Sequence, residues 1–403
     1  METPITIIGA GPAGMTAALF ATHTGAKVRL IDGNERVGRK LLVTGSGRAN
    51  LTNQHMDANL FACADPAWMK TLLGQFGHAE LIAFLESIGV LTYSTPDGWC
   101  YPVSESAQTV VEAFDNALRL AGIELVLNTK VTAIRSDKQS YSLTLDSGVV
   151  LNSERLIVAA GGKAYPTLGS RGELFGSLKA LGHTVLPLTP ALAPVTCDMT
   201  PYKKMLGVRL DARASLYEGT TLLAETTGNL IFTEWGLNGP AVMDLSHHIS
   251  ARSGAKLELR LNPLFASELT LRTLIARQRS TPTPLRILLG AVLPPKLPPV
   301  LLAKAGFSMD VKINELNDAQ IGKLFRLLTA LPFKVTGVRG FEYCQVSAGG
   351  VPVSEVDPLN MRSRTAPNLA LVGETLDVVG PCGGYNLQFA FSSGAVAGTK
   401  INN

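Results

Sequence analysis

The residues whose types and spacing first suggest chemistry are a set of glycines near the start of the chain and the acid that follows them. Gly9-Ala10-Gly11-Pro12-Ala13-Gly14 forms a G-x-G-x-x-G pattern. In such a pattern the first glycine allows a tight turn, the second lets the backbone approach a pyrophosphate group, and the third lets a helix pack closely on a strand. Asp32 is placed to accept hydrogen bonds from ribose hydroxyls and to repel a 2′-phosphate. Together they predict a dinucleotide-binding site.

The elements that must position these residues can also be predicted. Residues 5–8 form a short apolar run typical of a buried parallel strand, and an apolar helical pattern follows, with Gly25 as its stop. Residues 27–31 predict a second strand that ends at Asp32. The pyrophosphate would then meet the positive end of the helix. An ordinary strand-to-helix turn is the alternative, but the order of strand, glycines, helix, strand and acid favours the dinucleotide site.

Further candidate contacts follow along the chain. Residues 38–40 and 44–50 bring cations and glycines just after the acid, where cations could neutralise phosphate and a glycine-rich loop could lie against a planar ring system. The alternative for these residues is a solvated basic loop. Two later apolar runs, 156–162 and 369–374, predict buried strands that end in glycines, which suggests further close approaches to the nucleotide.

The composition limits the class of protein. The chain has 403 residues, enough for two to three domains, and 46% of them are hydrophobic. Its apolar runs are broken before the ~20 residues that a membrane span needs, and no signal-peptide pattern follows Met1, so we expect a cytoplasmic protein with no membrane partner. The 5 cysteines are scattered without a Cys-x-x-Cys pair, which argues against a dithiol reductase or a metal site. The net charge of +4, with no long basic run, argues against a nucleic-acid partner.

The order of strand-like and helix-like patterns along the chain predicts one nucleotide-binding domain interrupted by a large insertion. We expect the first part of that domain at 1–187, a strand-rich insertion at 188–262, a helical subdomain at 263–335, and the second part of the nucleotide domain at 336–403. The helical subdomain is basic, with 10 of the 36 Lys and Arg residues but only 4 of the 32 Asp and Glu residues.

Four segments resemble the HI0933-like family of bacterial flavoproteins, the group that contains YhiN and BaiN. These are residues 8–14, 38–53 (GRKLLVTGSGRANLTN), 230–246 (LIFTEWGLNGPAVMDLS) and 345–394, of which the last is the longest and most specific. The resemblance implies an α/β fold, in which a Rossmann-like, glutathione-reductase-like FAD-binding domain is interrupted by an inserted β-barrel and a helical subdomain. It also implies non-covalent FAD, and one member of the family reduces unsaturated bile-acid rings.

Motif and resemblance together give a predicted set of site residues. Asn386 is expected to cap the final helix, so that this helix start, including the backbone of Leu387, contacts the N1/C2=O edge of the flavin. The predicted cofactor-binding residues are Gly9, Gly11, Ala13, Gly14, Asp32, Gly38, Arg39, Lys40, Arg48, Asn50, Val131, Gly161, Gly162, Gly373, Glu374, Asn386 and Leu387. The candidates for a catalytic role are Glu234, Trp235, Arg48 and Cys382, although an ordinary barrel turn would also explain the first two, and a small packed residue the last.

Three positions depart from the family pattern. Ala49 stands where the family often has Cys, so no role of that thiol is carried over. Glu234 stands where the family often has His, so an acid/base step that uses this histidine is not carried over to this chain. Asp32 stands where flavoproteins of this type commonly have the longer Glu.

The sequence therefore predicts an FAD-dependent oxidoreductase, a reductase of a small unsaturated or carbonyl-conjugated substrate. A second G-x-G-x-x-G is absent, so NAD(P)H or a redox protein would have to deliver electrons without a Rossmann domain of its own. The alternative is an FAD-dependent RNA-modifying or redox-sensing protein, in which the basic insertion would be the nucleic-acid surface.

Overall fold

The computed structural model describes residues 4–137 and 140–402, and the chain divides into two compact units. One unit comprises the chain up to Thr189 together with the segment from Phe341 onward, and the other is Pro190–Gly340. The first unit therefore contains both ends of the chain, and the second is a single insertion. The finer division of this insertion at residue 262 stays a prediction.

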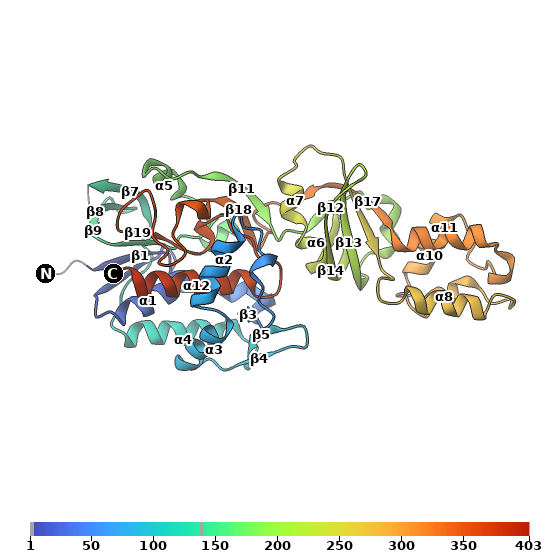
Figure 1. The fold of residues 1–403 in the computed structure, drawn as a ribbon, viewed down its shortest axis with the longest axis horizontal. Coiled ribbons are helices and arrows are strands. Elements are labelled where there is room, and N and C mark those ends of the chain that lie inside the picture. The colour runs from blue at the N-terminus through green and yellow to red at the C-terminus, as the bar shows by residue number, and fades with distance from the viewer. Residues whose placement is uncertain (1–3, 138–139, 403) are drawn as a thin grey trace. The chain divides into compact units, whose positions relative to one another are not determined.

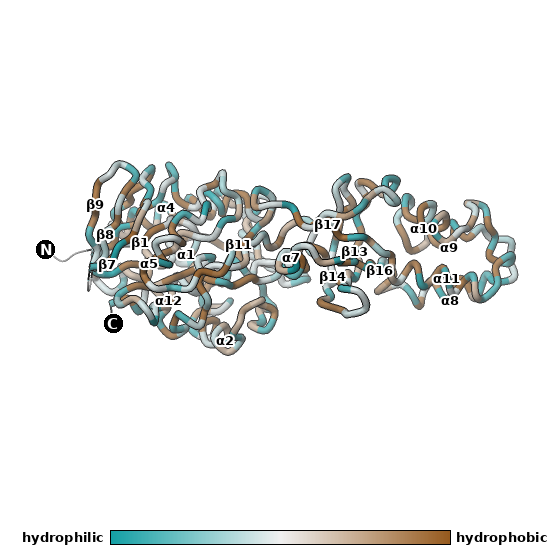
Figure 2. Tube along the Cα trace, turned by 90° about the horizontal axis from the view of Figure 1, so that it is seen from above, coloured by the Kyte–Doolittle hydropathy of each residue, from teal (hydrophilic) through white to brown (hydrophobic). Residues whose placement is uncertain are grey.

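The first unit is built on a parallel sheet whose strands follow the order β19-β10-β1-β2-β6 (Figure 1). Its strands are β1 (Ile5–Ile8), β2 (Val28–Ile31), β6 (Glu124–Val126), β10 (Leu156–Val158) and β19 (Leu369–Leu371). The three central strands are almost continuously apolar because elements cover both faces of the sheet (Figure 2). The expected order of a Rossmann-like domain is thus present, with the carboxyl ends of β1, β10 and β19 side by side.

Helices cover one face of this sheet and a small antiparallel sheet covers the other (Figure 1). The helices are α1 (Pro12–Thr22), α4 (Ala107–Leu120) and α12 (Tyr385–Lys400). On the other face are β7 (Val131–Asp137), β8 (Ser140–Leu145), β9 (Val150–Ser153) and α5 (Phe175–Ala180).

The first unit contains two further small sheets and two further helices. One group is a three-stranded sheet in the order β3-β5-β4, namely β3 (Thr52–Asn53), β5 (Trp99–Pro102) and β4 (Thr92–Ser94). Helices α2 (Pro66–Gln75) and α3 (His78–Ser87) lie between β3 and β4 in the sequence. Strand β18 (Val346–Gly350) pairs with β11 (Leu186–Ala191).

The second unit contains a closed six-stranded barrel in the order β12-β15-β14-β13-β16-β17. Its strands are β12 (Val195–Cys197), β13 (Arg209–Glu218), β14 (Thr221–Thr233), β15 (Gly236–Asn238), β16 (Leu257–Asn262) and β17 (Leu331–Val338). Short helices α6 (Pro240–Met243) and α7 (Ser246–Ser250) follow β15. The prediction of a helical subdomain up to residue 335 is wrong for residues 331–335. These residues belong to β17, which pairs with β12 and β16 and closes the barrel.

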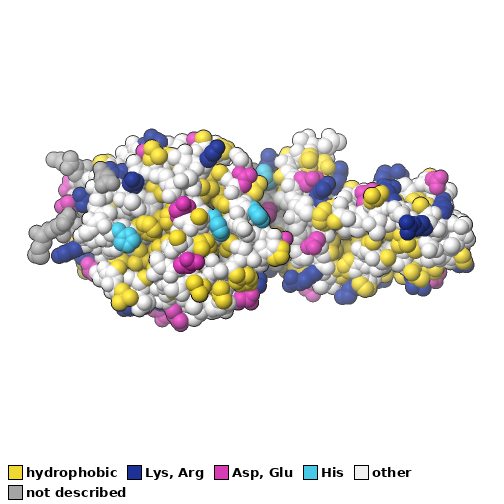
Figure 3. Space-filling view, turned by 60° about the horizontal axis from the view of Figure 1, so that its bottom comes forward, with side chains coloured by type: hydrophobic (Ala, Val, Ile, Leu, Met, Phe, Trp, Pro, Cys, Tyr) yellow, Lys and Arg dark blue, Asp and Glu magenta, His cyan; other side chains and the backbone are white. Residues whose placement is uncertain are grey.

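Four helices occupy the segment between β16 and β17. They are α8 (Glu268–Arg277), α9 (Leu285–Gly290), α10 (Leu297–Ala305) and α11 (Asp318–Thr329). The basic side chains of this part are interspersed with acidic, hydrophobic and uncharged ones on the face drawn in Figure 3. Arg279 is not simply solvated, because it donates to Ile313 O at 2.8 Å and to Asp318 Oδ1 at 3.0 Å.

No helix among residues 4–137 and 140–402 combines the length and the apolar character that crossing a membrane requires.

Candidate cofactor-binding site

The glycine turn between β1 and α1 has the geometry that a phosphate group requires. Gly9 has a φ of +102°, and a Cβ there would lie 2.3 Å from Ala159 O. A Cβ at Gly14 would lie 1.8 Å from Gly9 O, so both positions demand glycine. At Gly11, by contrast, a Cβ would meet no described atom within 4 Å. The space in front of the helix start is therefore open, and a pyrophosphate fits where the free N–H groups of the first turn point.

Asp32 lies at the end of β2, where its carboxylate is fixed by two neighbours. Ala10 N donates to Oδ2 at 2.6 Å, while Asn34 donates to Oδ1 from its backbone N at 2.7 Å and from Nδ2 at 2.8 Å. The Asn34 side chain also accepts from Arg39 Nη1 at 2.9 Å and donates to Leu168 O at 3.3 Å. Because a carboxylate has about four acceptor positions, Asp32 keeps one for a ribose hydroxyl.

A second carboxylate, that of Glu374, joins predicted site residues that are far apart in the sequence. Its Oε2 lies 2.7 Å from Lys40 Nζ, and its Oε1 accepts from Ser347 N at 2.8 Å and from Ser347 Oγ at 2.9 Å. A Cβ at Gly162 would lie 2.0 Å from Ser347 Oγ and 2.7 Å from Glu374 Oε1. Gly162 is therefore glycine because the Ser347 hydroxyl and this carboxylate occupy the space of a side chain.

These groups surround the first turn of α1. Gly38 N donates to Ala10 O at 2.8 Å, which places the basic segment after β2 alongside the glycine turn. A Cβ at Gly373 would lie 3.0 Å from the Cβ of Ala13, and Gly373 N donates to Ser393 Oγ at 2.9 Å. The structure thus brings together the motif glycines, Gly38, Lys40, Gly162, Gly373 and Glu374 at the carboxyl edge of the sheet.

The turn before the last helix differs from the prediction in one respect. The expectation that Asn386 caps α12 is wrong, because the helix begins at Tyr385 and Gly384 is its N-cap, with a φ of +95° that favours glycine. The Asn386 side chain instead accepts from Gly380 N and donates to Gly380 O, both at 2.8 Å. It closes the Gly380–Tyr385 turn, and the contact of the helix start with the flavin, including that of Leu387, stays a prediction.

Other predicted residues have individual surroundings. The Arg48 guanidinium stacks on the Tyr101 ring at 4.5 Å, and burial raises the pKa of this tyrosine. Asn50 is buried, and its side-chain amide faces the carbonyls of Thr52 and Cys100. Val131 is a buried strand residue, Gly161 has a φ of +73°, and the Cys382 thiol is half-buried.

Glu234 and Trp235 lie in the second unit, between β14 and β15. Glu234 is exposed, while the Trp235 ring is covered by the Arg339 guanidinium at 4.9 Å. Trp235 O also accepts from Cys197 N at 3.1 Å. Their predicted place beside the substrate stays a prediction.

Sequence reasoning missed Asn34 and Ser347. Asn34 has a weak signal, because an Asn two residues after an Asp commonly donates back to it in a local turn. Ser347 has none, since its partner Glu374 is brought to it only by the pairing of distant segments.

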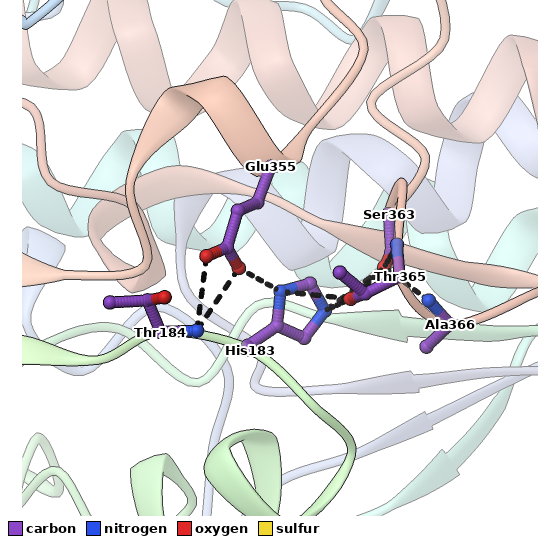
Figure 4. Close-up of polar contacts among 6 residues, drawn as sticks. All are labelled: His183, Thr184, Glu355, Ser363, Thr365 and Ala366. Atoms are coloured by element: carbon purple, nitrogen blue, oxygen red, sulfur yellow. Dashed lines mark hydrogen bonds and ion pairs between the residues drawn. The ribbon is translucent and has the colours of Figure 1, made fainter.

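A separate polar cluster in the first unit has a Ser–His–Glu order (Figure 4). Ser363 Oγ lies 2.9 Å from His183 Nε2, and Glu355 Oε2 lies 2.7 Å from His183 Nδ1. However, Ser363 Oγ accepts from Thr365 N and Ala366 N at 3.1 and 2.8 Å, so its lone pairs are used in a turn. This cluster stabilises the segment that precedes β19, whereas Gly373 and Glu374 of the candidate cofactor site follow that strand.

With this geometry in place, comparison with known proteins identifies the family. The profile described as the HI0933-like protein Rossmann domain matches residues 3–400. The chain belongs to the HI0933-like family. The family and the Rossmann-type fold class predicted from the sequence are therefore confirmed.

Two curated relatives match nearly the whole chain. The 3-dehydro-bile acid delta(4,6)-reductase of Clostridium scindens is 35% identical over 401 residues, 98% of this chain and 98% of the relative. The ribosomal RNA dihydrouridine synthase of Escherichia coli is 30% identical over 392 residues, 96% of this chain and 95% of the relative.

Two solved structures share the fold. The 3-ketosteroid delta1-dehydrogenase from Sterolibacterium denitrificans is 12% identical with a TM-score of 0.54, and the match covers 99% of each chain. The 3-ketosteroid-delta4-(5alpha)-dehydrogenase from Rhodococcus jostii RHA1 is 14% identical with a TM-score of 0.51, and covers 100% of this chain and 97% of the other. At this identity the likeness concerns the fold alone.

Proposed function

We propose that this FAD-dependent oxidoreductase of the HI0933-like family reduces a carbon–carbon double bond that is conjugated to a carbonyl group. The two curated relatives described above are named for such a change. A 3-dehydro bile acid with delta-4,6 unsaturation carries ring double bonds conjugated to a ketone, and dihydrouridine arises when the uracil bond conjugated to a ring carbonyl is saturated. That two relatives with unlike substrates, matched over the whole chain, share this bond change is the observation that carries the proposal.

The residues at the carboxyl edge of the sheet hold the cofactor in this proposal. Bound FAD supplies the two electrons of the reduction. The first turn of α1 presents its N–H groups to the pyrophosphate through the open space at Gly11, and Asp32 accepts a ribose hydroxyl. Lys40 adds positive charge near the phosphates. Glu234 and Trp235 are proposed to line the substrate side, with Glu234 the candidate for proton transfer.

The substrate class that we favour is a small molecule with a conjugated ketone, because the relative with the higher identity acts on one. NAD(P)H is the proposed electron donor. The experiment is anaerobic reduction of the purified protein by NADH and NADPH, followed by reoxidation with a 4-en-3-one steroid. Return of the oxidised flavin spectrum with formation of the saturated ketone is expected. A flavin that is reduced but not reoxidised by any conjugated ketone would contradict this substrate class.

A second candidate, reduction of uridine in ribosomal RNA, is favoured by two observations. One is the second relative, and the other is the basic segment 263–335, which contributes 10 Lys and Arg against 4 Asp and Glu. Arg277 is the residue to test because, unlike Arg279, no described partner engages its side chain. If RNA is the substrate, Arg277→Glu should weaken RNA binding and reduce its dependence on salt, because each phosphate contact releases counterions. Unchanged RNA binding, with steroid reduction intact, would favour the small molecule.

A further inference from the structure

Four separate segments of the first unit are joined by hydrogen bonds around the half-buried carboxylate of Glu374. Glu374 pairs with Lys40 Nζ through one oxygen at 2.7 Å, and through the other it accepts two hydrogen bonds from Ser347, at 2.8 and 2.9 Å. The Ser347 hydroxyl in turn accepts from Lys163 N at 3.0 Å. Ser347 is fully buried, and the exposed fractions of the Lys40 and Glu374 side chains are only 22% and 16%. The hydrogen bonds from Ser347 therefore hold the Glu374 carboxylate, and with it the ion pair, in one geometry.

The two residues of the ion pair follow glycines that contact the turn before α1 and its first residues. Lys40 follows Gly38, whose N–H bonds to Ala10 O in the glycine turn, and Glu374 follows Gly373, which abuts Ala13. An open helix start is an anion site because its free N–H groups and the helix dipole both favour negative charge. The Lys40 ammonium has three donors and Glu374 uses one of them, which leaves two for phosphate oxygens.

We propose that Ser347 is a positioning residue for the cofactor, fixing the Glu374 carboxylate so that this carboxylate holds the Lys40 ammonium against the dinucleotide pyrophosphate. The inference rests on the proposed function, since it takes FAD as the ligand. It explains why Gly162 must lack a side chain, because a Cβ there would collide with the Ser347 hydroxyl at 2.0 Å. Three of the roughly four acceptor positions of the Glu374 carboxylate are used by Lys40 and Ser347, so in this proposal its main effect on the cofactor is exerted through Lys40.

The test is the affinity of the full-length apoprotein for FAD, measured by flavin fluorescence at several salt concentrations. Lys40→Met should weaken binding roughly tenfold or more at low salt and flatten the salt dependence, because a charge contact to phosphate is lost. Ser347→Ala should weaken binding in the same direction. In the Lys40→Met background Ser347→Ala should have no further effect, because residues that act as one unit are not additive. Lys27→Met, at an exposed lysine before β2, is the matched control.

The outcomes are separable. If Ser347→Ala leaves FAD affinity unchanged, or if its effect adds fully to that of Lys40→Met, the inference is wrong. Gly162→Ala provides a second route, since its methyl group should displace the Ser347 hydroxyl and reproduce the same loss and the same non-additivity. Thermal unfolding of each apoprotein identifies a variant that has lost its fold. If either Ser347→Ala or Gly162→Ala does not fold, the FAD affinity of the other one tests the inference. If the wild-type apoprotein binds no FAD at any salt concentration, the proposed function itself fails.

Discussion

Nδ1 of His183 lies 2.7 Å from Oε2 of Glu355, and the imidazole is completely buried. Thr184 N donates to both oxygens of the same carboxylate at 3.1 Å. Burial acts to raise the pKa of Glu355, but the hydrogen bonds from Thr184 and His183 outweigh it and hold this pKa below its ordinary value. The pair therefore links the stability of the segment before β19 to pH.

The first prediction is that Glu355→Gln destabilises the protein at neutral pH and less so in acid. A carboxyl group whose pKa is lowered by folding stabilises the fold above its unfolded pKa, near ~4.3, and loses that contribution as the pH falls through the folded value. The difference in free energy of unfolding between wild type and variant should thus be full above about pH 5 and shrink below about pH 4. Urea unfolding across this range measures it.

The control for this experiment is Glu86→Gln, at an exposed position in α3. It should leave the free energy of unfolding nearly unchanged at every pH, since surface substitutions usually have small effects. A constant difference between wild type and Glu355→Gln over the whole pH range would show that the charge of Glu355 does not contribute.

The parts of the fold that local sequence dictates were predictable. The strand at 5–8 is found at the same residues, because a short apolar run before the glycines forms a buried strand whatever its partners are. The start of strand β17 is predicted as helix because Leu331 and Pro332 continue the Leu- and Pro-containing pattern of the helical segment before it. Its strand character depends on pairing with β12 and β16. Ser347 was missed for the same reason, since only the folded chain brings it to Glu374.

The second prediction concerns the ribose end of the cofactor site. Asp32→Ala removes the acceptor for Ala10 N and Asn34 as well as that for a ribose hydroxyl, so FAD binding should weaken by about 1–3 kcal/mol. Asn34→Ala should weaken it less, because Asp32 keeps its bond from Ala10 N. Titration of the apoprotein with FAD measures both. Asp146→Asn, in the exposed β8–β9 turn, is the control, and equal affinities for Asp32→Ala and this control would contradict the assignment.

The third prediction concerns the turn between β14 and β15. Glu234→Gln and Trp235→Ala should change turnover of a genuine substrate and leave the flavin spectrum largely intact, because these residues are proposed to line the substrate side. Trp235→Phe is the matched control, since it retains an aromatic ring beneath the Arg339 guanidinium. Steady-state kinetics at saturating donor would detect the change. Wild-type kinetics in both variants would place the substrate pocket elsewhere.

The last prediction concerns the start of α12. The N–H groups of its first turn and the positive end of its dipole are predicted to face the N1/C2=O edge of the flavin, which carries more negative charge after reduction. Donors aimed at developing charge stabilise the reduced form more than the oxidised form. Asn386 fixes this helix start through its two hydrogen bonds to Gly380, so Asn386→Leu should misalign the donors and lower the reduction potential.

The expected shift is about 30 mV, because one hydrogen bond of ~1.4 kcal/mol corresponds to that value in a two-electron couple. Spectroscopic titration against a reference dye measures it in protein that retains FAD. Asn152→Leu, at an exposed position of β9, is the control and should keep the wild-type potential. Because the Asn386 side chain bonds to the turn and not to the helix backbone, loss of FAD would report a loosened turn, whereas an unchanged potential with FAD fully bound would show that the helix start does not face the flavin ring.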